Sequence, residues 1–230
     1  MRKEVQDLQS FLTQKSFTIE PNVLDAGCGS RRFLKFPQET IFTGIDISQR
    51  QLEKYDDLNI KILGDISTYP LENNKYDLII SWDVLEHLAA PIKALNNLIG
   101  SLKWKGYLIL AMPNVFSLKG IVTKYTPHWF HVFVYRKIYG QKNAGLNDTA
   151  PFKTYLKNSI SKSSIKKITM RNNLDLVFFR QYDSKSKQFK KKSKFLFLIY
   201  VTSCLFLKVI SFNKLGGFGN SDLIYVLQKN

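Results

Sequence analysis

A glycine-rich turn and a carboxylate that follows it are spaced so that they can hold a nucleoside. The segment NVLDAGCGS (residues 22–30) runs from a short apolar stretch into a Gly-X-Gly turn. Gly27 and Gly29 allow the backbone to turn tightly and to approach a ligand closely, because neither has a side chain in the way. Asp46 ends the next apolar stretch, 21 residues after Asp25, and its two carboxylate oxygens match the adjacent hydroxyls of a ribose.

The elements that must position these groups are strands alternating with helices. This alternation predicts an α/β fold, a Rossmann-like doubly wound and mostly parallel seven-stranded sheet with an insertion after the fifth strand. Asp65 ends the third strand, so it should meet Asp46 at the carboxyl edge, where open α/β sheets bind ligands. The predicted strands are Val23–Ala26, Ile41–Ile47, Ile60–Leu63, Tyr76–Trp82, Tyr107–Met112, Asp175–Tyr182 and Leu223–Leu227, and helices are expected from Gln49 and over Pro91–Leu102 and Ser161–Asn172.

The length of 230 residues fits one domain that carries additions to this sheet. Residues 1–20 are expected to form an N-terminal helical cap. Residues 113–158 are aromatic, basic and too long for a simple connection, which predicts an irregular insertion on the substrate side. Residues 185–212 form a basic and then apolar insertion between the last two strands.

The glycine turn does not fit a dinucleotide. A dinucleotide site needs a third glycine, in the pattern Gly-X-Gly-X-X-Gly, so that a helix N-terminus can face a pyrophosphate. Arg32 stands at that position. The pattern therefore disfavours NAD and favours a nucleoside ligand without phosphate.

Five ordered segments over residues 21–113 give the chain its family resemblance: VLDAGCGS, GIDIS, LGDIS, YDLIISWDVLEHL and LKWKGYLILAMPN. In this order they resemble class I S-adenosylmethionine-dependent methyltransferases, especially ubiquinone-type O-methyltransferases and methyltransferases of bacterial surface-glycan clusters. The resemblance implies an enzyme whose cofactor is S-adenosylmethionine. One departure is Arg31, which stands where the family often has a small residue.

The resemblance also implies a role for each motif residue. The first motif would cradle the methionine part, with Asp25 ordering its amino group. Asp46 would hold the ribose, Asp65 would accept from the adenine amino group, and Ile66 would lie beside the ring. Ser81 and Trp82 lie where the fourth strand would meet the sulfonium and the substrate. The full expected set is Asp25, Gly27, Cys28, Gly29, Asp46, Ile47, Asp65, Ile66 and Ser81.

A hydroxyl acceptor needs a base to remove its proton, and a histidine is the usual choice. The candidates are His87, His128 and His131. His128 and His131 lie in the insertion, in TPHWFHVF, and His128 is the predicted base or substrate contact. Aromatic packing in a lid is the alternative role for this pair. His87 follows Glu86, and some ubiquinone-type relatives hold a divalent metal with Glu-X-X-Glu-His at this place. Here the first acid is Asp83, so no metal is predicted.

The residues after the fourth strand help to define the acceptor. Methylation of a nucleobase amine normally shows Asn/Asp-Pro-Pro-Tyr/Phe at this point, and this chain has Ser81-Trp82-Asp83-Val84. Methylation at cytosine C5 needs a cysteine nucleophile, and Cys28 lies in the wrong turn. We therefore expect O-methylation of a glycan, lipid-linked or small-molecule acceptor, with nucleic acid disfavoured. The alternatives are an RNA methyltransferase, suggested by charge alone, and a non-catalytic relative that binds the cofactor.

The net charge of +16 is concentrated in the C-terminal part of the chain. Residues 151–230 carry 16 basic and 3 acidic side chains, which favours an anionic partner. Six lysines within Lys185–Lys194 precede the apolar run Phe195–Phe212, which is shorter than the ~20 residues of a membrane span. The run is expected to touch an anionic membrane, to be a buried structural helix, or to form a dimer interface.

The N-terminus and the cysteines indicate a compartment. The first residues, MRKEVQDLQSFLTQKS, are polar and lack the apolar core of a signal peptide. The two cysteines, Cys28 and Cys204, fit neither a disulfide framework nor a zinc site. We expect a cytoplasmic protein, with peripheral association with a membrane as one of the roles open to the apolar run.

Overall fold

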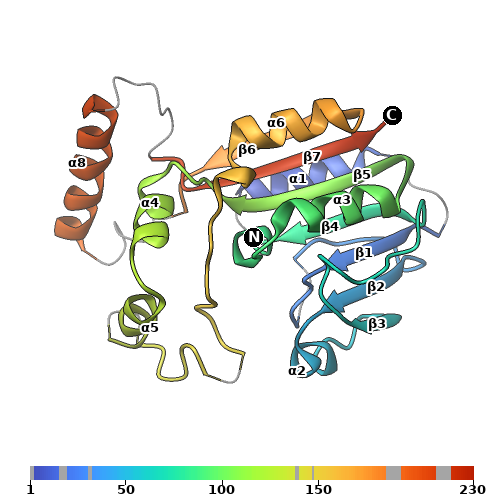
Figure 1. Ribbon diagram of the computed structural model, residues 1–230, viewed down its shortest axis with the longest axis horizontal. Coiled ribbons are helices and arrows are strands. Elements are labelled where there is room, and N and C mark those ends of the chain that lie inside the picture. The colour runs from blue at the N-terminus through green and yellow to red at the C-terminus, as the bar shows by residue number, and fades with distance from the viewer. Residues whose placement is uncertain are drawn as a thin grey trace.

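The fold is a seven-stranded sheet with helices on both faces, as predicted (Figure 1). A computed structural model describes residues 3–15, 20–30, 33–137, 140–146, 148–184, 193–210 and 219–230. The strand order is β3-β2-β1-β4-β5-β7-β6, and every pair is parallel except those that β7 makes with β5 and β6. The strands are β1 Asn22–Ala26, β2 Ile41–Asp46, β3 Ile60–Leu63, β4 Tyr76–Trp82, β5 Leu102–Pro113, β6 Leu174–Tyr182 and β7 Asp222–Lys229.

The strand boundaries agree with the apolar segments except at the start of β5. That strand begins at Leu102 rather than at Tyr107, and Leu102 pairs with Tyr76 across a register shift. The intervening segment KWKG is largely polar and exposed, so it lacks the apolar alternation by which a strand is recognised.

Alternate side chains of the central strands enter two separate cores, one on each face of the sheet. Val23 packs with α1 (Lys3–Thr13) and α2 (Gln49–Glu53), whereas its neighbour Leu24 packs with α3 (Pro91–Ser101) and α6 (Lys162–Arg171). This alternation follows from the period of two in a strand. Because both faces are buried, the cofactor motifs can meet only at an end of the sheet.

The predicted insertion contains more regular structure than we expected from its sequence. It forms α4 (Leu118–Tyr125) and α5 (His128–Lys137), followed by an extended stretch that reaches the short helix η2 (Asn158–Ile160). Ser117 begins α4 as its N-cap, since its side chain accepts a hydrogen bond from the Gly120 N–H. The expectation of an irregular segment was therefore wrong for these two helices.

The apolar run of the C-terminal part forms α8 (Lys194–Ile210), which stands apart from the sheet beyond α4 (Figure 1). The Tyr200 hydroxyl fixes it to the end of β6 by donating to Asp183 Oδ2 at 3.0 Å. Within the described ranges, no helix is both long and apolar enough to cross a bilayer. The lysines Lys185, Lys187, Lys190, Lys191 and Lys192 lie outside the described residues.

Candidate active site

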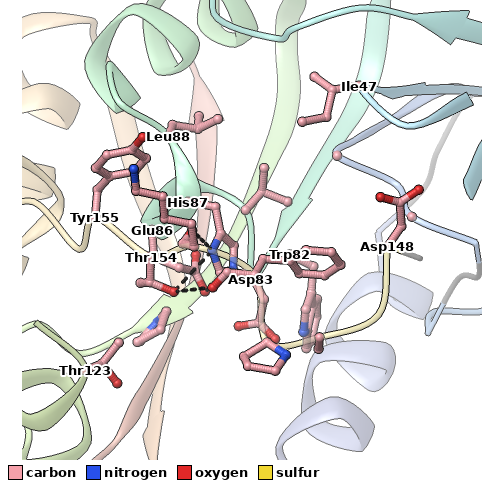
Figure 2. Close-up of a pocket in the computed structure, with 18 of the residues that line it drawn as sticks. Ile47, Trp82, Asp83, Glu86, His87, Leu88, Thr123, Asp148, Thr154 and Tyr155 are labelled. Carbon is pink, nitrogen blue, oxygen red and sulfur yellow. Dashed lines mark hydrogen bonds and ion pairs between the residues drawn. The ribbon is translucent and has the colours of Figure 1, made fainter. Parts of the chain in front are cut away.

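A cleft of about 2060 Å³ opens at the carboxyl ends of β1, β2, β3 and β4. On one side the loops after these strands form its wall. On the other side the wall is made by α4, α5 and α8 and by residues 148–155 of the insertion. Figure 2 shows Asp83, Glu86, His87 and Thr154 gathered together, with Asp148 on the far side. The cleft thus joins the predicted cofactor motifs to the insertion.

The turn after β1 is held in a shape that only glycine adopts easily. Gly27 and Gly29 have φ angles of +73° and +57°, in the left-handed region. A Cβ atom on Gly27 would lie 2.5 Å from a methyl group of Val84, whereas one on Gly29 would meet nothing within 4 Å. Gly27 therefore packs on the segment after β4, and Gly29 leaves open space at the cleft.

Asp46 is held rigidly at the end of β2. Its Oδ2 accepts the Gly29 N–H at 2.9 Å, and its Oδ1 accepts the Ser48 N–H at 2.9 Å. Each oxygen keeps a further lone pair that can face a ligand. Asp65 lies at the end of β3, lines the same cleft and accepts the Ser67 N–H at 2.7 Å. Two separately fixed carboxylates suit the hydroxyl and amino donors of a nucleoside.

Most of the predicted cofactor residues meet at the cleft. The predicted residues that line it are Gly27, Cys28, Gly29, Asp46, Ile47, Asp65 and Ile66. Burial, Asp25 and Asp46 raise the pKa of the Cys28 thiol, which keeps it protonated and unsuited to nucleophilic attack.

Two of the predicted residues lie behind the cleft wall. Asp25 borders a small cavity of about 30 Å³ behind the turn, and its Oδ2 accepts the Tyr55 hydroxyl at 3.3 Å. Ser81 is 0% exposed and is not one of the described residues that line the cleft. Its neighbour Trp82 lines the wall at this point instead. Any effect of Asp25 or Ser81 on a ligand would therefore pass through the turn or the strand.

His87 presents one ring nitrogen to a fixed partner. Its Nδ1 lies 2.8 Å from the Lys153 carbonyl oxygen, which can only accept, so Nδ1 carries the proton and donates. Burial lowers the pKa of His87, and the Lys153 hydrogen bond offsets this only in part. The neutral ring therefore has a lone pair on Nε2 and lines the cleft. A neutral imidazole held in one tautomer is the form that a general base requires.

Glu86 is a buried acid beside His87. Its Oε1 lies 3.9 Å from His87 Nε2, and its Oε2 has no hydrogen-bond partner among the residues that the structure describes. Burial raises the pKa of Glu86 well above its ordinary value, and the Asp83 carboxylate adds to the effect. Glu86 thus favours the protonated, uncharged form. No group of three or more histidine, cysteine or acidic side chains in the described part of the chain is arranged to hold a metal.

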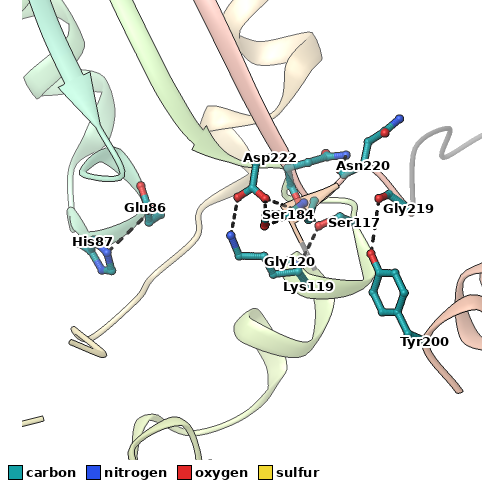
Figure 3. A network of polar contacts seen from close by, with 12 residues as sticks. Glu86, His87, Ser117, Lys119, Gly120, Ser184, Tyr200, Gly219, Asn220 and Asp222 are labelled. Carbon is teal, nitrogen blue, oxygen red and sulfur yellow. Dashed lines mark hydrogen bonds and ion pairs between the residues drawn. The ribbon is translucent and has the colours of Figure 1, made fainter. Parts of the chain in front are cut away.

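An ion pair fixes the insertion to the sheet at the floor of the cleft (Figure 3). Lys119 of α4 donates to Asp222 Oδ1 of β7 at 2.5 Å. Burial acts to lower the pKa of Lys119, but the Asp222 carboxylate outweighs it and raises that pKa. Ser184 and Ser221 also donate to Asp222. The pair is therefore a charged anchor of α4.

The two histidines of the insertion differ in their position relative to the cleft. His131 lines the cleft, and its Nε2 lies 2.9 Å from the Thr126 hydroxyl oxygen. His128, the predicted base, is exposed at the start of α5 and is not among the described cleft-lining residues. Of the three histidines, His87 has the position and tautomer best suited to a base. From the sequence His87 was one of three candidate bases, and His128 was preferred because it lies in the insertion.

Residues 148–156 form a strap across the cleft, and its two ends are attached to opposite walls. At one end the Ser48 hydroxyl donates to Asp148 Oδ2 at 2.8 Å, and the Gln51 side chain donates to the Asp148 carbonyl at 2.8 Å. At the other end the N–H groups of Tyr155 and Leu156 donate to the Glu86 carbonyl oxygen. Ser48 and Asp148 are 100 residues apart, and no sequence signal identified this contact.

Comparison with known proteins agrees with this geometry. The profile of a protein family described as "Methyltransferase domain" matches residues 1–177. The chain belongs to this family. An uncharacterized protein of Methanocaldococcus jannaschii is 35% identical over 111 residues, which are 48% of this chain and 47% of the relative. The match therefore spans about half the length of that curated relative.

Solved structures share the fold of this methyltransferase domain. A SAM-dependent methyltransferase from Archaeoglobus fulgidus has 15% identity and a TM-score of 0.54, over 98% of this chain and 93% of that one. A putative S-adenosylmethionine-dependent methyltransferase from Listeria monocytogenes has 14% identity and a TM-score of 0.56, over 99% and 100%. Phosphoethanolamine N-methyltransferase 2 from Haemonchus contortus, in complex with S-adenosyl-L-methionine, has 16% identity and a TM-score of 0.56, over 97% and 52%. The prediction of a class I S-adenosylmethionine-dependent methyltransferase is thus confirmed by family and fold.

The attachment of the strap can be tested by hydrogen exchange on the methyltransferase. Asp148→Ala removes the acceptor of the Ser48 hydroxyl, a bond worth about 1–2 kcal/mol. Amide exchange in residues 148–152 should therefore speed up about tenfold, while Tyr155 and Leu156 should keep their protection. The control is Asp56→Ala, which removes an exposed carboxylate of a surface turn. Unchanged exchange in residues 148–152 would show that Asp148 does not hold the strap.

Proposed function

We propose that this methyltransferase uses S-adenosylmethionine to methylate a hydroxyl group of a glycan, lipid-linked or small-molecule acceptor. The observation that carries the proposal is the meeting of the Gly27–Gly29 turn, Asp46, Asp65 and His87 in one cleft. The bound cofactor supplies a methyl group that is already activated. The protein then needs to position the acceptor and to remove its proton.

The cofactor site is proposed to lie between the turn after β1 and the ends of β2 and β3. Gly29 leaves room at the turn for the methionine part, and Asp46 accepts the ribose hydroxyls. Asp65 accepts the adenine amino group, with Ile47 and Ile66 beside the ring. Ile47 is 76% exposed, so its side chain is free to cover an apolar ring, and burying that surface on binding is favourable.

The proposed base is His87. Its Nε2 takes the acceptor proton, while the Lys153 carbonyl holds Nδ1–H and so stabilises the charge that the ring gains. As long as Glu86 remains protonated, it adds no negative charge to that of the neighbouring Asp83 carboxylate. The role predicted for His128 stays a prediction, since an exposed position can still be covered by an acceptor.

The cofactor assignment is tested at Asp46. Asp46→Ala should weaken binding of S-adenosylmethionine by about 2–3 kcal/mol, because a hydrogen bond to a charged group is lost. Calorimetry on the folded variant measures the change. Glu53→Ala removes an exposed carboxylate of the nearby helix α2 and should leave the affinity unchanged. Equal affinity of Asp46→Ala and the parent would refute the ribose site.

The base assignment is tested by comparing two histidines in one assay. His87→Ala should lower methyl transfer about 10²–10⁴-fold while cofactor binding stays intact, and His128→Ala should have a smaller effect. Radiolabelled methyl transfer to glycan and lipid fractions of a cell extract provides the assay.

The pH dependence gives an independent measurement. Because the folded pKa of His87 is lowered, the ring stays neutral as the pH falls through its ordinary value of 6.5 and becomes charged only below it. The rate of methyl transfer should therefore stay high as the pH falls past 6.5. It should decrease only at the lower pH at which the His87 ring becomes charged, and the His87 proton resonance should titrate in parallel. If His128→Ala abolishes transfer and His87→Ala does not, the base is His128.

We also propose that the basic segment and α8 bind an anionic membrane surface. Two signals act together in such anchoring, namely lysines that attract anionic lipid and apolar side chains that enter it. The support from the structure is that α8 exposes large apolar side chains to solvent, which are Phe195, Leu198, Leu205, Phe206 and Val209.

Lysine replacement tests the membrane contact. Changing Lys190, Lys191 and Lys192 to Gln should weaken binding to anionic liposomes by about 3 kcal/mol at low salt, and by less at high salt. Changing Lys61, Lys166 and Lys167 to Gln removes the same charge from exposed positions elsewhere and should have little effect. If the parent does not bind anionic vesicles at low salt, the membrane contact is refuted. It is also refuted if sedimentation shows a dimer whose interface covers α8.

A further inference from the structure

The cleft extends well beyond the part needed for the cofactor. Past Trp82 it continues between α4, α5 and α8, which extend beyond the end of the sheet (Figure 1). The side chains along this extension are mainly apolar or aromatic. The apolar and aromatic ones are Leu118, Val122, Phe130, Val134, Tyr135, Ile199 and Tyr200, and the same helices also contribute Lys119, Thr123, His131 and Ser203.

We infer that this extension, here called the apolar branch, binds the hydrocarbon chain of an anionic amphiphilic acceptor. The inference rests on the proposed function, since the head of that acceptor would carry the hydroxyl that reaches His87. It narrows the acceptor to a molecule with a long acyl or isoprenoid chain next to a negatively charged head.

The apolar lining supports a chain rather than a sugar. A glycan needs several hydrogen-bonding groups along its length, because burying unpaired hydroxyls is costly. Val122, Val134 and Ile199 cannot form side-chain hydrogen bonds, and the polar Lys119 and His131 already have partners in Asp222 and Thr126. Burial of a hydrocarbon chain against such side chains is favourable in proportion to its area.

The charge of the surrounding helices supports an anionic head. Together α4, α5 and α8 carry six lysine or arginine side chains and no acidic one. Lys119 is paired with Asp222, whereas Arg136 and Lys137 are exposed at the end of α5. Positive charge on the three helices around the cleft attracts an anionic amphiphile towards it.

The apolar branch connects the proposed base on its inner side to α8 on its outer side. On the inner side Trp82 and His87 line the same cleft, so a head group beside them is next to the proposed base. On the outer side α8 contributes Ile199, Tyr200 and Ser203 to the cleft, while it exposes Leu205 and Phe206. A helix with apolar side chains in both directions can pass an amphiphile from a lipid surface into the cleft.

Soluble alkyl phosphates test the chain site without knowledge of the natural acceptor. Binding of butyl, octyl and dodecyl phosphate, each below its micelle concentration, is measured by calorimetry on the full chain. The affinity should rise about two- to fourfold for each added methylene. Dodecanol and inorganic phosphate, which each offer half of the ligand, should bind more weakly than dodecyl phosphate.

Paired substitutions locate the bound chain. Ser203→Trp fills the branch and should weaken dodecyl phosphate binding at least tenfold, whereas Thr202→Trp adds similar bulk at an exposed neighbouring position and should leave it unchanged. On α5, Val134→Asp should weaken binding in the same way, and Phe133→Asp, at a position that is 50% exposed, should not. The second pair guards against misfolding of α8, and circular dichroism checks all four variants.

The outcomes separate this inference from the proposed function. Affinity that is independent of chain length, or equal loss in Thr202→Trp and Ser203→Trp, overturns the chain site, even if S-adenosylmethionine still binds normally. Loss of cofactor binding in the parent would instead contradict the proposed function. A chain-length dependence that only Ser203→Trp and Val134→Asp remove supports the inference.

Discussion

The close packing of Gly27 on Val84 is the contact on which the site depends. It brings the turn after β1 against the Val84 side chain of the segment after β4, because Gly27 has no side chain of its own to clash with it. The first segment belongs to the cofactor side and the second continues into Glu86 and His87. A residue larger than glycine would separate them and would also be strained at a φ of +73°. The Gly29 N–H of the same turn donates to Asp46. The turn therefore fixes the segment after β2 and the segment after β4 relative to each other.

The strap extends this coupling across the cleft. Its Lys153 carbonyl fixes the tautomer of His87, and a few residues earlier Asp148 is attached to Ser48, whose N–H holds Asp46. Opening the strap would therefore release the ring of His87 and expose the side of the cleft beside Asp46. A single segment of the insertion thus links the orientation of the base to the wall of the cofactor site.

Charges at the centre of the cleft are partly compensated, whereas exposed cations lie on the surrounding helices. Burial keeps His87 uncharged and favours protonated Glu86, while the charges of Lys119 and Asp222 compensate each other at the floor. The exposed cations lie farther out, on α5 and α8. Positive charge on these helices attracts anions towards the cleft.

The sequence alone was sufficient to predict the sheet and the residues that lie at its carboxyl edge. Apolar segments such as Tyr76–Trp82 form strands because both of their faces are buried, and the glycines and carboxylates that follow them must meet at that edge. These are local patterns, so they can be recognised without knowing the neighbours in space. The helices of the insertion were missed because α5 has an exposed aromatic pattern and no buried face.

Contacts between distant segments were decided only by the tertiary structure. The sequence does not show that Lys153 reaches His87, that Asp148 reaches Ser48, or that Lys119 pairs with Asp222. Nor does it show that Ser81 is buried while its neighbour Trp82 lines the cleft. His128 was chosen for its place in the insertion, and the path of α5 leaves it exposed, whereas burial and a carbonyl partner keep His87 neutral in one tautomer. Burial and hydrogen bonding depend on which segments pack together, and that is why the chemistry of these side chains followed the fold.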